Sequence, residues 1–182
     1  MGHLSIPPVI RITGGILKGR TIPVPGGAIR PAMDRMRESI FAILGDLSGV
    51  SFLDLFSGSG IIALEAASRG ASCLEAVESD PLKRKTLIGN AALSPVRIRC
   101  RFMAVELYIK RAKRSFDYIF CDPPFAYQYK NELIETITAS PLMDKESLFM
   151  FHHPKTEELQ RILALKETRS YGNSVVDFFV KT

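Results

Sequence analysis

The stretch Leu53-Asp54-Leu55-Phe56-Ser57-Gly58-Ser59-Gly60 decides the expected fold of this chain. It joins an apolar strand predicted over residues 50–56 to a helix predicted over 59–69. Glycine carries no Cβ, so the backbone can turn sharply here and come close to a ligand. Glu78 ends the next predicted strand, where a carboxylate can accept hydrogen bonds from both hydroxyls of a ribose. This order of features predicts a βα unit that binds a nucleoside.

The glycine turn alone leaves three interpretations open. Gly58-x-Gly60-x-x-Ala63 also satisfies the dinucleotide fingerprint, and a glycine-rich turn can be purely structural. Asp54 favours S-adenosylmethionine over a nicotinamide dinucleotide, because a carboxylate attracts the cationic amino end of methionine and repels a pyrophosphate.

The chain beyond residue 50 alternates apolar runs with helical segments. The predicted strands cover 50–56, 73–77, 96–102, 116–121, 147–151, 165–171 and 174–181, and the predicted helices cover 59–69, 80–92, 104–113, 127–139 and 156–163. Such alternation predicts an α/β fold with a mostly parallel, seven-stranded sheet covered on both faces. The last two strands leave no room for a helix between them, so we expect an antiparallel C-terminal hairpin.

The segment before this region has another character. Residues 7–31 are rich in proline and glycine, with β-branched stretches at 9–13 and 21–24 and turn signals at Gly14-Gly15 and Gly26-Gly27. We expect residues 1–31 to form a small β-hairpin appendage and residues 32–182 to form the main domain, which opens with helical spacing over 34–44.

Composition places the chain among globular proteins. Its 182 residues suit one domain, and no apolar run approaches the length of a membrane span. The first residues show neither a signal peptide nor a myristoylation signal, so a cytoplasmic location is expected.

Cysteines and histidines give no metal signature. Cys73, Cys100 and Cys121 match neither zinc spacing nor a disulfide framework, and buried free thiols are expected. His152 and His153 have no carboxylate or cysteine at ligand spacing, so a surface or packing role is expected and no metal site is predicted.

Positive charge is concentrated in two regions. Residues 1–45 hold six Lys or Arg against two acids, and residues 83–114 hold ten against Glu106 alone. Local excesses of this kind attract a polyanion such as a nucleic acid, although the second region is equally consistent with a solvated surface.

The motif Asp122-Pro123-Pro124-Phe125 follows the apolar strand predicted over 116–121. It therefore leaves the same edge of the sheet as the glycine turn. Proline fixes the backbone and removes the N–H donor, which leaves carbonyls beside one carboxylate and one aromatic ring. Such a loop offers acceptors to an amino group and a flat surface to a base. The alternative is a rigid loop with a buried Phe125.

Together these motifs resemble the Rossmann-like class I methyltransferases, and within them the RsmD-type guanine-N2 methyltransferases of bacterial small-subunit (16S) ribosomal RNA. The resemblance covers nearly the whole chain and is carried by residues 11–20, 30–38, 53–60, 65–71, 122–125 and 171–174. The run Arg30-Pro-Ala-Met-Asp-Arg-Met-Arg-Glu38 points to this particular family, whereas the glycine turn and the Asp-Pro-Pro-Phe loop occur in many amino methyltransferases.

The resemblance implies three sets of site residues. Asp122, Pro123, Pro124 and Phe125 would be catalytic. S-adenosyl-L-methionine would contact Asp54, Phe56, Gly58, Gly60, Glu78, Ser79, Met103 and Ala104. The RNA substrate would contact Arg11, Lys18, Arg20, Arg30, Arg35 and Arg37. The arginines of the 30–38 run could instead order a loop over the cofactor, or belong to a helix cap held by local ion pairs of Asp34 with Arg35 or Arg37. Tyr171 and Asn173 would either border the pocket or form an ordinary turn.

One residue departs from the family pattern. Met103 stands where the family commonly has an acid near the adenine of the cofactor, so apolar packing is expected to replace that contact.

The expected reaction is methyl transfer to the N2 amine of a guanine. Its substrate would be ribosomal RNA, either naked or in the assembled small subunit, and the protein would act as a monomer. Two other functions stay open. Asp-Pro-Pro-Phe cannot distinguish guanine N2 from adenine N6 on DNA or RNA, and the fold could serve a non-catalytic RNA-binding module in ribosome assembly.

Overall fold

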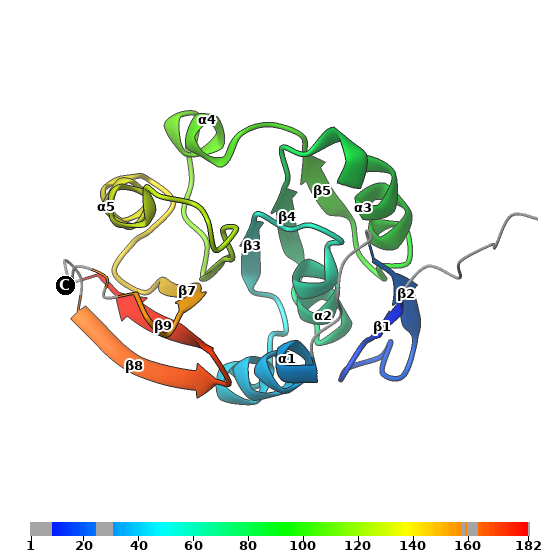
Figure 1. Cartoon of the computed structure of the whole chain (residues 1–182). Coiled ribbons are helices and arrows are strands. Elements are labelled where there is room, and N and C mark those ends of the chain that lie inside the picture. The colour runs from blue at the N-terminus through cyan, green and yellow to red at the C-terminus, as the bar shows by residue number, and fades with distance from the viewer. Residues whose placement is uncertain (1–8, 25–30, 158, 160–163, 182) are drawn as a thin grey trace, which may run out of the picture.

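A computed structural model of the chain describes residues 9–24, 31–157, 159 and 164–181. A seven-stranded sheet runs through the described part in the order β5-β4-β3-β6-β7-β9-β8 (Figure 1). The strands are β3 (Ser51–Leu55), β4 (Cys73–Val77), β5 (Ile98–Arg101), β6 (Tyr118–Cys121), β7 (Leu148–Pro154), β8 (Ala164–Tyr171) and β9 (Ser174–Val180). β5, β4, β3, β6 and β7 are parallel, whereas β9 is antiparallel to both β7 and β8. The predicted fold class is confirmed.

Helices cover both faces of the sheet. The helical elements are α1 (Pro31–Leu44), α2 (Ile61–Ser68), η1 (Pro81–Lys83), α3 (Arg84–Ala91), α4 (Val105–Lys110) and α5 (Lys130–Ala139). One apolar cluster packs α1, α2 and α3 on one face, and a second packs α4 and α5 on the other. Neighbouring strand residues alternate between the two clusters, as Phe52 and Leu53 do. Burial on both faces explains why these strands read as continuous apolar runs.

The N-terminal segment forms a two-stranded antiparallel sheet of β1 (Val9–Arg11) and β2 (Thr21–Pro23). Its apolar side chains Ile10, Ile12 and Ile22 belong to the same cluster as α1 and α2. The Asn90 side-chain amide also donates to Pro23 O at 2.9 Å. The predicted pairing of these two stretches is present, and it packs onto the domain.

Two predicted elements differ from the structure. The helix expected over 80–92 divides into η1 and α3, because Asp80 caps a 3-10 turn by accepting the Leu82 N–H. Most of the helix expected over 156–163 lies outside the described residues, and residues 156, 157 and 159 are not helical.

No helix in the described ranges is both long and apolar enough to cross a membrane.

Candidate active site

A cavity of about 1010 Å³ opens where the carboxyl ends of the central strands meet. The sheet order reverses at β3, with β4 on one side and β6 on the other, and ligands of open α/β sheets bind at such a point. The cavity is lined by Met33, Met36, Phe56, Gly58, Glu78, Ser79, Asp80, Lys83, Val105, Glu106, Asp122, Pro123, Pro124, Phe125, Tyr127, His152, Tyr171, Gly172, Asn173 and Ser174. The predicted glycine turn and the predicted proline loop therefore share one cavity.

The glycine turn adopts a backbone that most residues avoid. Phe56, Gly58 and Gly60 have φ values of 59°, 56° and 78°. A Cβ on Gly60 would lie 2.5 Å from Leu87 Cδ1, so the Leu87 side chain would have to shift, and the positive φ would strain any other residue. No atom of the described residues lies within 4 Å of a Cβ built on Gly58. Gly58 therefore leaves open space at the cavity wall.

Two carboxylates hold this turn. Glu78 Oε2 accepts the Gly58 N–H and Glu78 Oε1 accepts the Asp80 N–H, both at 2.8 Å. Asp54 Oδ2 accepts the Ala63 N–H in the first turn of α2 at 3.2 Å. Glu78 lines the cavity, whereas Asp54 is buried and does not. The buried position of Asp54 therefore does not match the expected contact with a cofactor. Its carboxylate instead stabilises the glycine turn from within the protein, through the bond to Ala63 N–H.

The cavity is acidic. Glu78, Asp80, Glu106 and Asp122 line it, and Lys83 is its one Lys or Arg side chain among the described residues. Burial raises the pKa of Asp54 well above its usual range; the Ala63 N–H opposes that rise, and the charges of Asp122 and Glu78 add to it. Such surroundings favour a cationic ligand and oppose a pyrophosphate.

The wall of the cavity beyond β5 carries an acid at another position than Met103. The wall beyond β5 is formed by Val105 and Glu106, whereas Met103 packs against the α4–α5 cluster and neither Met103 nor Ala104 lines the cavity. Glu106 also accepts the Tyr127 hydroxyl at 2.5 Å. Met103 and Ala104 therefore lie outside the cavity, and the first turn of α4 supplies this part of its wall.

The Asp122–Phe125 loop is fixed on several sides. The Asp122 N–H donates to Leu55 O at 3.2 Å, and Pro124 O accepts the Tyr127 N–H at 2.7 Å. The buried Lys130 ammonium donates to Phe125 O and Tyr127 O, both at 2.7 Å, and pairs with Glu157 at 3.0 Å. Phe125 remains 38% exposed, so the alternative of a buried ring is wrong and one face can meet a ligand.

His152 belongs to this site although the sequence interpretation assigned it to surface or packing. Its Nδ1 lies 2.7 Å from Asp122 Oδ1, and its ring meets Phe125 edge-on at a centroid distance of 5.4 Å. The parallel register pairs Cys121 with Phe151, so the next residue of each strand becomes a neighbour. Sequence spacing hides this partnership because the two residues lie on different strands.

The predicted RNA-contacting residues have three different outcomes. Arg11, Lys18, Arg20 and Arg35 are exposed, and Arg30 lies outside the described residues. Arg37 is only 1% exposed and does not reach the surface. It bonds to Asp34 at 2.9 Å and to Arg11 O at 3.1 Å, and its Nε lies 3.5 Å from Glu65. The prediction that Arg37 contacts RNA is therefore corrected: its charge is neutralised inside the protein.

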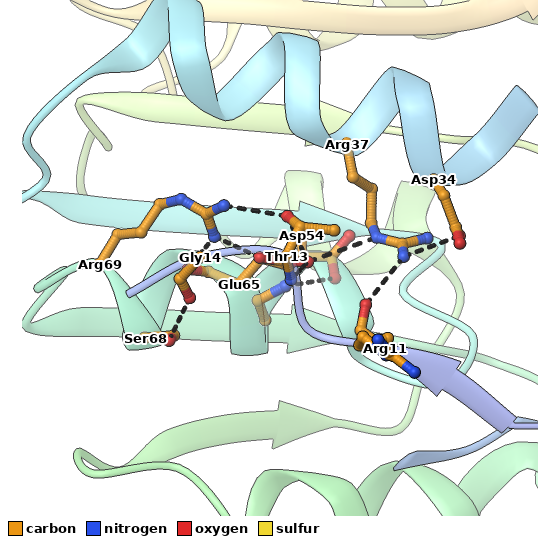
Figure 2. A network of polar contacts seen from close by, with 10 residues as sticks. Arg11, Thr13, Gly14, Asp34, Arg37, Asp54, Glu65, Ser68 and Arg69 are labelled. Carbon is orange, nitrogen blue, oxygen red and sulfur yellow. Dashed lines mark hydrogen bonds and ion pairs between the residues drawn. The ribbon is translucent and has the colours of Figure 1, made fainter. Parts of the chain in front are cut away.

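Glu65 is the centre of this buried network (Figure 2). Its Oε1 accepts both the N–H and the hydroxyl of Thr13, at 2.7 and 2.9 Å, and its Oε2 pairs with Arg69. Arg69 also donates to the Thr13 hydroxyl at 2.9 Å. These contacts join the N-terminal segment to α1 and α2, so two of the most specific sequence motifs hold the fold together.

Other predictions have direct outcomes. Tyr171 and Asn173 border the cavity. All three cysteines are free, but only Cys121 is fully buried, where burial raises its thiol pKa well above the usual range. No metal-binding group of three or more His, Cys, Asp or Glu side chains occurs in the part of the chain that the structure describes.

Comparisons with known proteins agree with this geometry. Residues 10–180 match the family described as "Conserved hypothetical protein 95". Ribosomal RNA small subunit methyltransferase D of Escherichia coli K12 is 33% identical over 142 residues, which cover 76% of this chain and 72% of the relative. The putative rRNA methyltransferase YlbH of Bacillus subtilis is 29% identical over 94% of this chain and 99% of its own length. The solved structure of the putative methyltransferase yhhF from Escherichia coli has a TM-score of 0.85 at 28% identity and covers 96% of this chain and 98% of its own.

Proposed function

Because this chain belongs to the Conserved hypothetical protein 95 family, which comprises RsmD-type methyltransferases, we propose that it methylates guanine N2 in small-subunit ribosomal RNA. The observation that carries the proposal is the shared cavity. The Gly58 turn and Glu78 line one part of it, and the Asp122–Phe125 loop lines another. A cofactor and an amino group of a base can therefore meet in one space.

The cavity suits S-adenosylmethionine. Glu78 has acceptor positions beyond the two that bind backbone N–H groups, and these suit ribose hydroxyls. Val105 offers apolar contact and Glu106 an acceptor on the adjoining wall. When bound, the cofactor supplies an electrophilic methyl group on a cationic sulfur. Four lining carboxylates against one lysine support such a cation over a nicotinamide dinucleotide.

Asp122 and Pro123 are the proposed acceptors for the amine of the base. An exocyclic amine is a poor nucleophile, because its lone pair is delocalised into the ring. A hydrogen bond from this amine to Asp122 or Pro123 O strengthens as positive charge grows on nitrogen, so it stabilises the transition state selectively. Phe125 would stack on the base and keep it in line for attack. The carboxylate would also accept the proton that the methylated amine releases.

The substrate must offer an unpaired or extruded base, because a stacked base cannot enter a cavity. We assign backbone contacts to the exposed Arg11, Lys18, Arg20 and Arg35, and we retain residues 1–31 as the RNA-contacting appendage. Arg30 remains part of this proposal. The protein would act in the cytoplasm as a monomer, on ribosomal RNA that is free or assembled into the subunit.

The test compares three substrates: free small-subunit RNA, the assembled subunit and DNA. Each is incubated with the protein and S-adenosylmethionine, and the modified nucleoside is identified by mass spectrometry. We expect N2-methylguanosine from RNA. N6-methyladenosine would assign the adenine alternative instead, and cofactor binding without transfer to any substrate would favour the non-catalytic module. Calorimetry that shows NAD binding without S-adenosylmethionine binding would identify a dehydrogenase.

Asp122→Ala tests the loop itself. Loss of an acceptor used in the transition state should lower kcat about 10²- to 10³-fold. Asp46→Asn is the control, because Asp46 is exposed and does not line the cavity. Full activity of Asp122→Ala would exclude the catalytic assignment.

A further inference from the structure

His152 is a buried residue whose two described side-chain contacts both fall on the catalytic loop. Only 4% of its side chain is exposed, yet the ring lines the cavity. Its Nδ1 is 2.7 Å from Asp122 Oδ1, and its ring packs against Phe125 at an interplanar angle of 62°. One side chain therefore touches both the carboxylate and the aromatic ring that the proposed reaction uses.

The surroundings of the ring indicate which nitrogen carries the proton. An ionised carboxylate only accepts, so the short contact requires Nδ1–H as donor. Nε2 is buried and has no partner among the described residues. A ring with its only proton on Nε2 would instead set a bare Nδ1 against the carboxylate oxygen, and two acceptors would then face each other at 2.7 Å. The contact thus places a proton on Nδ1.

We propose that His152 is a positioning residue for methyl transfer. It binds Oδ1 of Asp122 and so fixes the rotation of the carboxylate, while Oδ2 is left for the amine of the base. The Asp122 side chain is 27% exposed, which allows this second oxygen to reach the cavity. The edge-on contact also fixes the position of the Phe125 ring relative to the Asp122 carboxylate. This inference rests on the proposed role of Asp122.

His153 offers a matched control. It is the next residue of β7, it is equally buried, and it also pairs with an aspartate, Asp177, at 3.2 Å. Successive strand residues point to opposite faces, and His153 does not line the cavity. Changes at His153 therefore have the structural cost of losing a buried histidine without the proposed effect on Asp122.

Two substitutions separate the hydrogen bond from the packing. Asn places an amide N–H near the position of Nδ1, whereas Phe keeps a ring and removes the donor. We expect His152→Phe to lower kcat about 10- to 100-fold, the scale of a misplaced reacting group. His152→Asn should recover at least half of that loss on a logarithmic scale. KM for S-adenosylmethionine should stay within about twofold, because Gly58 and Glu78 are untouched. His153→Phe and His153→Asn should leave kcat within about threefold.

A direct measurement keeps the inference testable if a variant fails to fold. Long-range ¹H–¹⁵N NMR of the wild-type protein reports the tautomer of each histidine, and His152 should carry its proton on Nδ1. Three results would overturn the inference: an Nδ1 without a proton, a His152→Phe kcat within threefold of wild type, or a His152→Asn kcat no higher than that of His152→Phe. If the wild-type product proves to be methyladenine, the proposed guanine specificity fails. The kcat ratios and the tautomer then still test whether His152 positions Asp122.

Discussion

Phe125 is an apolar side chain that stays 38% exposed in the same loop as the Asp122 carboxylate. Stacking of a base on an aromatic ring contributes about 1–3 kcal/mol. We therefore expect Phe125→Ala to lower kcat/KM for RNA about 5- to 150-fold, while the free energy of unfolding changes by less than about 1 kcal/mol because the ring is not in the core. Steady-state kinetics and urea denaturation measure the two quantities. Loss of stability without loss of kcat/KM would show that the ring only packs.

Glu75 gives a prediction on pH. Burial acts to raise its pKa, but the hydrogen bond and charge of Arg101, with Tyr108 and Arg114, hold the pKa below its ordinary value. A lowered pKa means that the carboxylate stabilises the fold fully above its unfolded-state pKa, and that this stability is lost as pH falls through the folded-state pKa. Urea denaturation at pH 7 and pH 3 should therefore show a smaller loss of stability in Glu75→Gln than in the wild type.

At pH 7 the same variant should be less stable than the wild type by about 1–3 kcal/mol, the usual scale for a hydrogen bond to a charged group. Equal pH dependence of the two proteins would contradict the role given to Glu75.

Single residues show where sequence reasoning succeeds and where it stops. Glu78 and Asp122 could be placed because each directly follows a predicted strand, and parallel strands end at one edge. His152 and Asp54 could not. The partner of His152 depends on the register between β6 and β7, and the role of Asp54 depends on which backbone N–H its carboxylate reaches. Neither is encoded by local spacing.

At the scale of elements, Glu65 connects α2 to the N-terminal segment and to α1. It is 0% exposed and faces the cations of Arg37 and Arg69. Removing one partner of a buried charge pair leaves the other uncompensated, at a cost of about 3–5 kcal/mol. Glu65→Ala should therefore be destabilised by about that amount in urea denaturation.

Glu38→Ala serves as the comparison, because Glu38 is exposed on α1 and should change stability by less than about 0.5 kcal/mol. Equal stability of the two variants would show that the network of Figure 2 contributes little.

The elements themselves were largely predictable, because strands that are buried on both faces leave long apolar runs between turn signals. Their tertiary contacts were not. The run from Asp34 to Arg37 has the charge of an RNA-binding motif, yet Arg37 points into the protein toward a carboxylate 28 positions away. In the same way Met103 occupies the predicted position of an acid, but the first turn of α4 brings Glu106 to the wall instead.

At the scale of the whole molecule, the acidic cavity lies in a protein of net charge +5. Phosphates should therefore bind outside the cavity while the cofactor and base enter it. Each phosphate contact with a single strand contributes about 0.7 to the salt dependence of log K. Replacing Lys18 and Arg20 with Gln should weaken RNA binding and reduce that slope by about 1–1.5, as measured by fluorescence anisotropy at several salt concentrations.

Lys145→Gln is the control for this measurement, because Lys145 is exposed in the loop between α5 and β7, far along the chain from the N-terminal segment, and does not line the cavity. An unchanged slope in the double variant would place the RNA on another surface.

The buried bond between Thr13 and Glu65 spans 52 positions and has a consequence for synthesis of the chain. Thr13 and Arg37 are made before α2, so their contacts with Glu65 can form only after that helix has been synthesised. Closing a loop of this length costs entropy that only the later contacts offset. The N-terminal segment is therefore expected to dock late in folding, after the helix that it depends on has been translated.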